Sequence, residues 1–311
     1  MQIRLGILAV LMAGAMAAQE VRTLKVQGNV YLLSGAGGNV VVQVGDEGVV
    51  VVDTGAAGRT DALIAAIRKL SDKPLQWIIN TNMHPDFIGG NDAMRKAGVT
   101  ITGANVAGNL TDAGDGAQVI AHENLLNRVS APTGKQAAYA FGYWPTATYV
   151  TGQKELFFND EPIEAKWMKN ASTDGDSIVF FRRSDVVVAG DVMSTTSYPF
   201  IDAANGGTVD GLIEALNVII DIAIPKHQEE GGTYVVPGHG RICDEFDVVE
   251  YRDMVTIVRD RVRAGMKKSM TLAQIQKAGY TKDYDLRYNV AGTKVTADAF
   301  IEAIYKTLGG K

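Results

Sequence analysis

Residues 81–91 read Thr-Asn-Met-His-Pro-Asp-Phe-Ile-Gly-Gly-Asn, and the rest of the chain is organised around this stretch. It follows residues 77–80, Trp-Ile-Ile-Asn, a short run typical of a buried strand. A helical pattern begins after the two glycines. His84 and Asp86 are therefore expected on a loop at the carboxyl end of a strand, where open sheets present functional groups. Because they are two residues apart, their side chains can point at one ion.

The two residues that flank this pair are poor metal ligands. Asn82 carries a neutral amide, which binds zinc weakly, and Phe87 has no lone pair at all. The loop thus has the setting of a metal site but lacks side chains that a full site would need.

The composition is that of an ordinary globular protein. The chain has 311 residues, of which 46% are hydrophobic and 21% charged, so it is long enough to bury a large core. A formal net charge of -5 and the lack of a Lys/Arg run disfavour nucleic acid as a partner. With Cys243 as the single cysteine, no intrachain disulfide can form.

The amino terminus has the pattern of a secretory signal peptide. Arg4 supplies a positive charge, residues 5–12 are an apolar run, and residues 15–17, Ala-Met-Ala, resemble a cleavage site. We expect residues 1–17 to be removed and residues 18–311 to form one domain, exported to the periplasm or secreted and free of the membrane. An uncleaved anchor or a core helix is the alternative, although the run is short for a membrane span.

The two halves of the chain share an order of strands followed by a helix. Each strand series is rich in β-branched residues and separated by turn residues, and each helix has apolar residues at helical spacing. This order predicts an α/β (α+β) fold in which two packed sheets carry helices outside, a four-layer αββα sandwich. The first half has strands over 23–26, 29–33, 40–44 and 49–52 and a helix over 59–70; the second has strands over 155–158, 163–168, 178–182 and 186–189 and a helix over 209–224; a strand over 99–102 and a helical turn over 106–110 are expected between them.

Two further polar residues follow predicted strands. Asp191 comes just after the strand over 186–189, and His239 ends another strand with Pro-Gly before it. Both are therefore expected at strand carboxyl ends, like His84 and Asp86. Two imidazoles and two carboxylates on such loops could hold one divalent ion.

Other titratable residues have weaker cases. Asp53 ends a buried strand at a Thr-Gly turn, where it could support the metal loop or simply accept from turn amides. His122 precedes a predicted helix and is expected to cap or pack, and His227 lies in a polar loop and is expected to be solvated. Cys243 is expected to be a buried, inert thiol, because no partner base is identifiable.

Several motifs together resemble the metallo-β-lactamase superfamily, in order and in rough spacing, over nearly all of the mature chain. The resemblance is closest to exported bacterial metallo-hydrolase-like members. It implies the αββα fold and a site of two metals, usually zinc, with a bridging hydroxide as nucleophile. The motifs are Asp53-Thr54-Gly55, residues 81–91, Thr173-Asp174-Gly175-Asp176, Gly190-Asp191 and Pro237-Gly238-His239-Gly240.

The chain departs from the superfamily at metal-ligand positions. The superfamily loop reads His-x-His-x-Asp-His, and here Asn82 and Phe87 replace its first and last histidines. Ser172 stands where a further histidine usually precedes Thr-Asp-Gly-Asp. The resemblance implies that the first metal site keeps only His84 and Asp191. The positions that remain as metal ligands are His84, Asp86, Asp191 and His239.

The resulting hypothesis is a superfamily member with a degenerate metal centre that holds at most one zinc ion, or none. It predicts no ordinary two-zinc hydrolase activity and the binding of a small molecule, which residues 130–146 and 191–207 would contact. The alternative is a one-metal hydrolase of an ester, lactam, thioester or related bond. In that case Asp86, Asp191 and His239 hold the ion, and Asp86 is the candidate catalytic residue. Hydrolysis without metal is a third possibility, for which no nucleophile–base pair is apparent.

Overall fold

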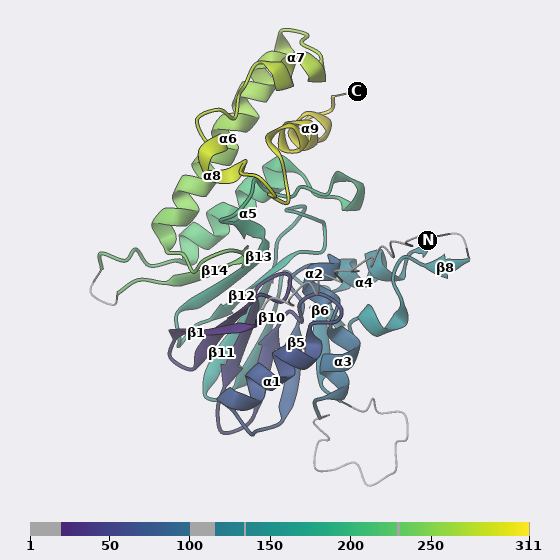
Figure 1. Ribbon diagram of the computed structural model, residues 1–311, viewed down its shortest axis with the longest axis vertical. Helices are drawn as coiled ribbons and strands as arrows, with labels where there is room; N and C mark the ends of the chain where they lie inside the picture. Colours follow the sequence, from purple (N-terminus) through teal and green to yellow (C-terminus); the bar gives the residue numbers. More distant parts are fainter. Residues whose placement is uncertain (1–19, 100–115, 134, 229–230, 311) are drawn as a thin grey trace, which may run out of the picture.

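A computed structural model describes residues 20–99, 116–133, 135–228 and 231–310 (Figure 1). The expected signal peptide over residues 1–17 lies outside the described residues. So do the helical turn over 106–110 and, apart from Val99, the strand over 99–102. Within the described ranges, no helix combines the length and the apolar character that crossing a membrane requires.

The first sheet has seven strands within the described residues, in the order β1-β2-β3-β4-β5-β6-β9. Strands β1 to β4 form an antiparallel meander, whereas β4, β5, β6 and β9 run parallel. The parallel strands end at the same edge, so the loops that follow β4 and β5 are brought together there. The strands are β1 (Arg22–Gln27), β2 (Val30–Ser34), β3 (Val40–Val44), β4 (Val49–Val52), β5 (Leu75–Ile79), β6 (Gln118–His122) and β9 (Ala147–Tyr149).

The second sheet has the order β10-β11-β12-β13-β14 in the described part of the chain. Its first four strands are antiparallel, and β14 pairs with β13 in parallel. The strands are β10 (Gln153–Phe158), β11 (Glu161–Trp167), β12 (Ser177–Phe181), β13 (Val186–Ser194) and β14 (Tyr234–His239); a separate hairpin joins β7 (Pro132–Thr133) and β8 (Gln136–Ala137).

Helices cover the outer face of each sheet, and α6 to α9 extend away from the sandwich at one end (Figure 1). The helices are α1 (Thr60–Leu70), α2 (Pro85–Ile88), α3 (Asn91–Lys96), α4 (Glu123–Ser130), α5 (Val209–Ile222), α6 (Glu245–Lys267), α7 (Leu272–Lys277), α8 (Asp285–Tyr288) and α9 (Ala297–Thr307), with 3-10 turns η1 (Phe141–Tyr143) and η2 (Ala203–Asn205).

The valine run of β4 shows why this sequence makes a four-layer fold. Side chains alternate across a strand, so Val50 and Val52 face the second sheet while Val49 and Val51 face α1. All four are fully buried. A continuous apolar run is typical of a strand covered on both faces. The predicted αββα sandwich is confirmed.

Two details differ from the expectation at the site edge of the sheets. The strand expected over 186–189 continues to Ser194, and its pairing with β14 becomes irregular around Gly190. Gly190 has φ +54, and a Cβ there would lie 2.4 Å from the Thr81 hydroxyl, so only glycine fits. Asp191 therefore follows a distorted step within the strand. Residues 85–88, expected as loop, form the helical turn α2.

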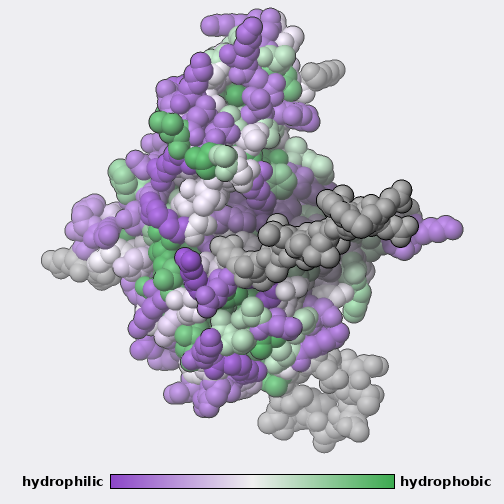
Figure 2. Space-filling view, viewed as in Figure 1, coloured by the Kyte–Doolittle hydropathy of each residue, from purple (hydrophilic) through white to green (hydrophobic). Residues whose placement is uncertain are grey.

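The surface in Figure 2 is mostly hydrophilic, above all over the C-terminal helices at the top. Among large hydrophobic side chains, Leu286 is 96% exposed, Phe141 81% and Phe157 67%. These residues belong to three separate elements, α8, η1 and β10. Single exposed apolar residues of this kind are normal on a protein surface.

Candidate functional site

The four predicted site residues meet at the carboxyl ends of the strands, and His84 is held there between two carboxylates. Its Nδ1 lies 2.8 Å from Oδ2 of Asp191, and its Nε2 lies 3.2 Å from Oδ2 of Asp202. Burial alone would lower the pKa of His84, but the two carboxylates outweigh burial and raise this pKa to about 9. The hydrogen bond from His84 lowers the pKa of Asp202 to about 2. Because both ring nitrogens of His84 face carboxylate oxygens, neither offers a free lone pair to a metal.

The second half of the site is organised by a lysine from the far end of the chain. The ammonium of Lys294 donates to Oδ2 of Asp86 at 2.8 Å and lies 3.3 Å from Nε2 of His239. It also lies 3.9 Å from Oδ2 of Asp191. His239 Nε2 is itself 3.0 Å from Asp86 Oδ2. Burial would raise the pKa of Asp86, yet its bonds to His239 and Lys294 hold this pKa well below its usual range.

Two aromatic rings flank the Lys294 ammonium. Its nitrogen lies 5.8 Å from the ring centroid of Phe87 and 5.6 Å from that of Phe200. A cation within about 6 Å of a ring centroid is attracted by the electron-rich face. Phe87 also packs edge-on against His239, at 5.4 Å between centroids. The rings thus favour an organic cation at this point.

Phe87 fills a space that two glycines keep open. Its side chain is fully buried. A Cβ at Gly38 would lie 2.9 Å from Cε1 of Phe87, and one at Gly238 would lie 2.9 Å from its Cζ. The ring is therefore tightly accommodated, and it supplies packing in place of a ligand.

The other two replaced ligand positions are also tied into hydrogen bonds. Asn82 donates from Nδ2 to Oδ1 of Asp176 at 2.8 Å, and its Oδ1 accepts from the backbone N–H of His84. Ser172 donates to the backbone carbonyl of Phe200 at 2.6 Å. Asn82 shapes the loop that carries His84, and Ser172 fixes the residue that covers His84 and Lys294.

Asp53 acts on the loop rather than on an ion. Its carboxylate accepts from the backbone N–H of Thr81 at 2.8 Å and from the Thr81 hydroxyl at 2.6 Å. Complete burial raises its pKa to about 8. Asp53 therefore holds the first residue of the 81–91 stretch, and its support of a metal loop stays a prediction.

Two described residues of the 130–146 segment, which is predicted to contact a ligand, are linked to the site region. Asn91 donates to the carbonyl of Tyr143 at 2.8 Å, which ties η1 to the 81–91 stretch. Tyr139 has a raised pKa because it is buried and because Asp202 and Asp86 are near. An ionisable aromatic side chain of this segment thus senses the site carboxylates.

Sequence reasoning missed three residues of the site. Asp202 belongs to the irregular 191–207 stretch, and Phe200 precedes it there. Lys294 stands in the turn between α8 and α9, 208 residues from Asp86. None belongs to a motif, so only the three-dimensional structure reveals them.

The remaining histidines behave as the sequence indicates. His122 caps α4, because its Nδ1 accepts from the backbone N–H of Asn124 at 3.2 Å. Its ring stacks on Trp167, with centroids 4.5 Å apart. His227 is exposed.

Cys243 is expected to be unreactive in the folded protein. It is 3% exposed, and burial raises the pKa of its thiol to about 12. Only roughly one molecule in 10,000 would then carry the thiolate at pH 8. A colourimetric thiol reagent should react slowly with native protein and stoichiometrically in denaturant. Rapid reaction of the native protein would contradict this.

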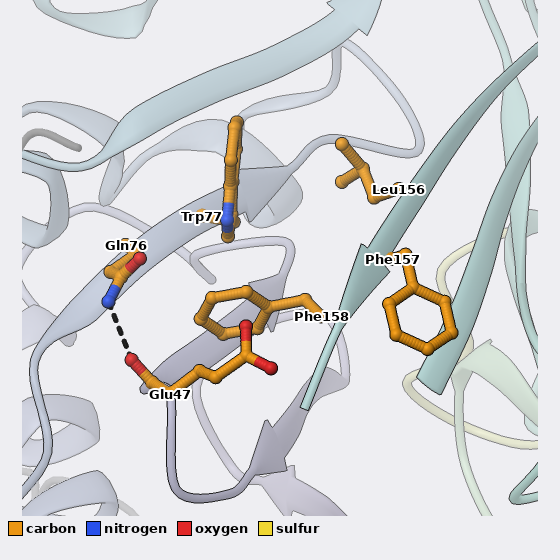
Figure 3. Close-up of a pocket in the computed structure, with 6 residues that line it drawn as sticks. All are labelled: Glu47, Gln76, Trp77, Leu156, Phe157 and Phe158. Atoms are coloured by element: carbon orange, nitrogen blue, oxygen red, sulfur yellow. Dashed lines mark hydrogen bonds between the residues drawn. The ribbon is translucent and has the colours of Figure 1, made fainter. Parts of the chain in front are cut away.

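A hollow of about 450 Å³ is lined by side chains from both sheets (Figure 3). Trp77 from β5 and Phe158 from β10 line it, so it opens between the two sheets. Glu47 is its one carboxylate, and Gln76 donates to the Glu47 carbonyl at 2.6 Å. It is separate from the charged site, which follows the other end of β5.

The residues present do not fit the metal that the fold family implies. Across the described ranges, no group of three or more His, Cys, Asp or Glu side chains is arranged to hold a metal ion as the chain stands. The chemistry explains this: His84 bonds carboxylates through both ring nitrogens, and Lys294 places a positive charge against Asp86 and His239. A zinc ligand must instead offer a free lone pair.

The fold and the site edge place the chain in a known class. The sequence signature of the metallo-beta-lactamase superfamily matches residues 26–241. The chain therefore belongs to this superfamily, as its motifs predict. Superfamily members usually bind zinc, whereas the described residues of this chain include no group of three or more side chains arranged to hold a metal ion.

Individual relatives include sulfatases and lactamases. The chain is 44% identical over 45 residues to a linear primary-alkylsulfatase from Pseudomonas sp., a match covering 14% of this chain and 8% of the relative. The structure resembles the sec-alkylsulfatase Pisa1 from Pseudomonas sp., with a TM-score of 0.65, 16% identity and 93% of this chain covered. It also resembles a metallo-beta-lactamase from Pontibacter korlensis, with a TM-score of 0.56, 15% identity, and 76% of this chain and 99% of that chain covered.

The matches to these relatives cover only part of the sulfatases, and the structural matches are at low sequence identity. The chain covers half the length of Pisa1, and its 45-residue match covers 8% of the alkylsulfatase. At these low identities the structural matches show a shared fold. They do not transfer a substrate.

Proposed function

We propose that this protein binds a small molecule at the charged site and does not perform two-zinc hydrolysis. The observation that supports this most directly is the pairing of His84 with Asp191 and Asp202, which uses both nitrogens of an expected zinc ligand. A metal-activated water needs the strong field of a bound ion to ionise near neutral pH. In this chain the side chains that would hold such an ion are instead paired with each other or with Lys294.

The part of the site nearest to solvent indicates where a ligand would bind. The side chain of Lys294 is 38% exposed and that of Asp86 23%, whereas Asp191 is 4% exposed. Phe200 and Tyr139 stand beside these groups. We propose that the ligand lies over Lys294, between the 130–146 and 191–207 segments.

Purified protein should carry at most one tightly bound divalent ion per chain. The reason is that Asn82, Phe87 and Ser172 supply no metal-binding imidazole. With zinc added, turnover of β-lactams, thioesters, phosphodiesters and alkyl sulfates should stay near background. Elemental analysis after dialysis and spectrophotometric assays measure both. Two zinc ions per chain, or turnover at ordinary enzyme rates, would overturn the proposal.

A one-metal hydrolase is the second candidate, and one observation favours it. Asp86, His239 and Asp191 surround a single point, now taken by the Lys294 ammonium, at 2.8, 3.3 and 3.9 Å. Three such side chains and a water would suit a catalytic zinc. Zinc-dependent turnover that Asp191→Ala abolishes would support this candidate.

Binding itself can be measured directly. Calorimetric titration with short alkyl sulfates and alkyl carboxylates should give heat with the natural protein and little with Lys294→Met. If these compounds bind the natural protein and Lys294→Met equally, the binding site does not include Lys294. The hollow beside Trp77 would then be the next region to probe.

A further inference from the structure

We infer that the ammonium of Lys294 is the resident cation of this site and takes the place of a metal ion there. Its nitrogen lies within 4 Å of Asp86, His239 and Asp191, the three side chains that the superfamily motif assigns to one metal. This inference concerns what fills the site, so it stands apart from any ligand that the protein binds.

The carboxylates of the site need compensating positive charge. Asp86, Asp191 and Asp202 gather three carboxylates in one small region, and such a group would repel itself without compensating cations. His84 lies between Asp191 and Asp202 and contacts both, whereas Asp86 is contacted by Lys294. The lysine completes a balance that an ion provides elsewhere in the superfamily.

Two aromatic rings surround the Lys294 nitrogen. Phe87 stands at a former ligand position, and its ring faces the ammonium together with that of Phe200. An aromatic ring cannot bind zinc through a lone pair, but it attracts an ammonium. Phe87, which stands at a former ligand position, therefore favours the ammonium of Lys294 over a zinc ion at this point.

Lys294 comes from a part of the chain that the superfamily signature does not cover. Lys294 lies between α8 and α9, beyond residues 26–241, where the superfamily signature matches. The turn between two C-terminal helices thus brings a tethered cation to the site edge of the sandwich. A tethered cation cannot be removed by a chelator, so the site should stay ordered without any metal.

The test is to remove the ammonium and measure zinc binding. Lys294→Met keeps an unbranched side chain without charge and leaves Asp86, His239 and Asp191 free to share an ion. Zinc should bind Lys294→Met about 100-fold more tightly than the natural protein, because an ammonium and a dication compete for the same carboxylates. Calorimetry and elemental analysis give the affinity and the stoichiometry, and a thermal melt with and without zinc should show stabilisation in the variant alone.

Two matched variants complete the design. Lys294→Arg keeps the positive charge and should still exclude zinc. Lys306→Met removes another lysine of the C-terminal helices, one paired with Glu302, and should behave like the natural protein. If Lys294→Met folds poorly, producing it in zinc-supplemented medium and measuring its metal content gives the same answer.

Equal zinc affinity in the natural protein and Lys294→Met would overturn the inference, as would zinc binding by neither. Hydrolysis by the natural protein at ordinary enzyme rates would instead refute the proposed function. The two failures are therefore distinguishable.

Discussion

Replacing Asp191 with alanine should destabilise the metal-free protein by about 3 kcal/mol, the lower end of what removing one partner from a buried ion pair costs. Asp191 and His84 have side chains only 4% and 8% exposed, and they are bonded at 2.8 Å. The loss would leave the buried imidazolium of His84 with Asp202 alone. It would also deprive Lys294 of a nearby negative charge.

This expectation separates the two views of the site. If Asp191 served chiefly as a metal ligand, its removal from metal-free protein would relieve repulsion with Asp86 and Asp202 and would stabilise the fold or leave it unchanged. Chemical denaturation in the presence of a chelator measures the difference. A neutral or stabilising Asp191→Ala under these conditions would contradict the ion-paired site.

A surface ion pair provides the control. Asp92 pairs with Lys96 on α3, and their side chains are 52% and 64% exposed. Asp92→Ala should cost less than about 1 kcal/mol, as is usual for exposed pairs. Asp191→Asn, which keeps an oxygen acceptor for His84, should fall between the two.

The fold was predictable because its signals are local and repeated. The run Val49–Val52 is buried on both faces, and its meaning follows from composition and length alone. The ends of β5, β13 and β14 then place His84, Asp191 and His239 at one edge by the geometry of parallel strands. Motif and fold supported each other at these positions.

The occupants of the site could not be predicted in the same way. Lys294 joins Asp86 across 208 residues of chain, and Asp202 joins His84 across 118. A single lysine in a turn carries no periodicity or spacing that would connect it to a distant loop. The sequence indicated which ligands were missing, but only packing of the C-terminal helices shows what replaced them.

Restoring three histidines should therefore be insufficient to rebuild a two-metal site. The changes Asn82→His, Phe87→His and Ser172→His return the superfamily's ligand types, yet Lys294 would still occupy the point between Asp86 and His239. We expect two zinc ions only when Lys294→Met is added to these three changes.

The rebuilt protein should be much less stable without metal. Truncating a buried Phe costs roughly 3–5 kcal/mol, and Phe87→His should cost less because the imidazole refills part of the space. Ser172 is fully buried, so a larger side chain there should add about 1–3 kcal/mol of overpacking. Asn82→His also removes the bond to Asp176.

Zinc should then restore stability to the fourfold variant, because an ion that binds only the folded state shifts the unfolding equilibrium. Thermal melts with zinc and with chelator, combined with elemental analysis, compare the triple and fourfold variants. The fourfold variant should bind two ions and melt at a higher temperature with zinc, and the triple variant should bind fewer. A folded fourfold variant whose melting ignores zinc would show that the loops carrying His84, Asp191 and His239 no longer converge on a metal. In that case Phe87 and Lys294 would be part of a rebuilt core that substitution at these positions cannot convert.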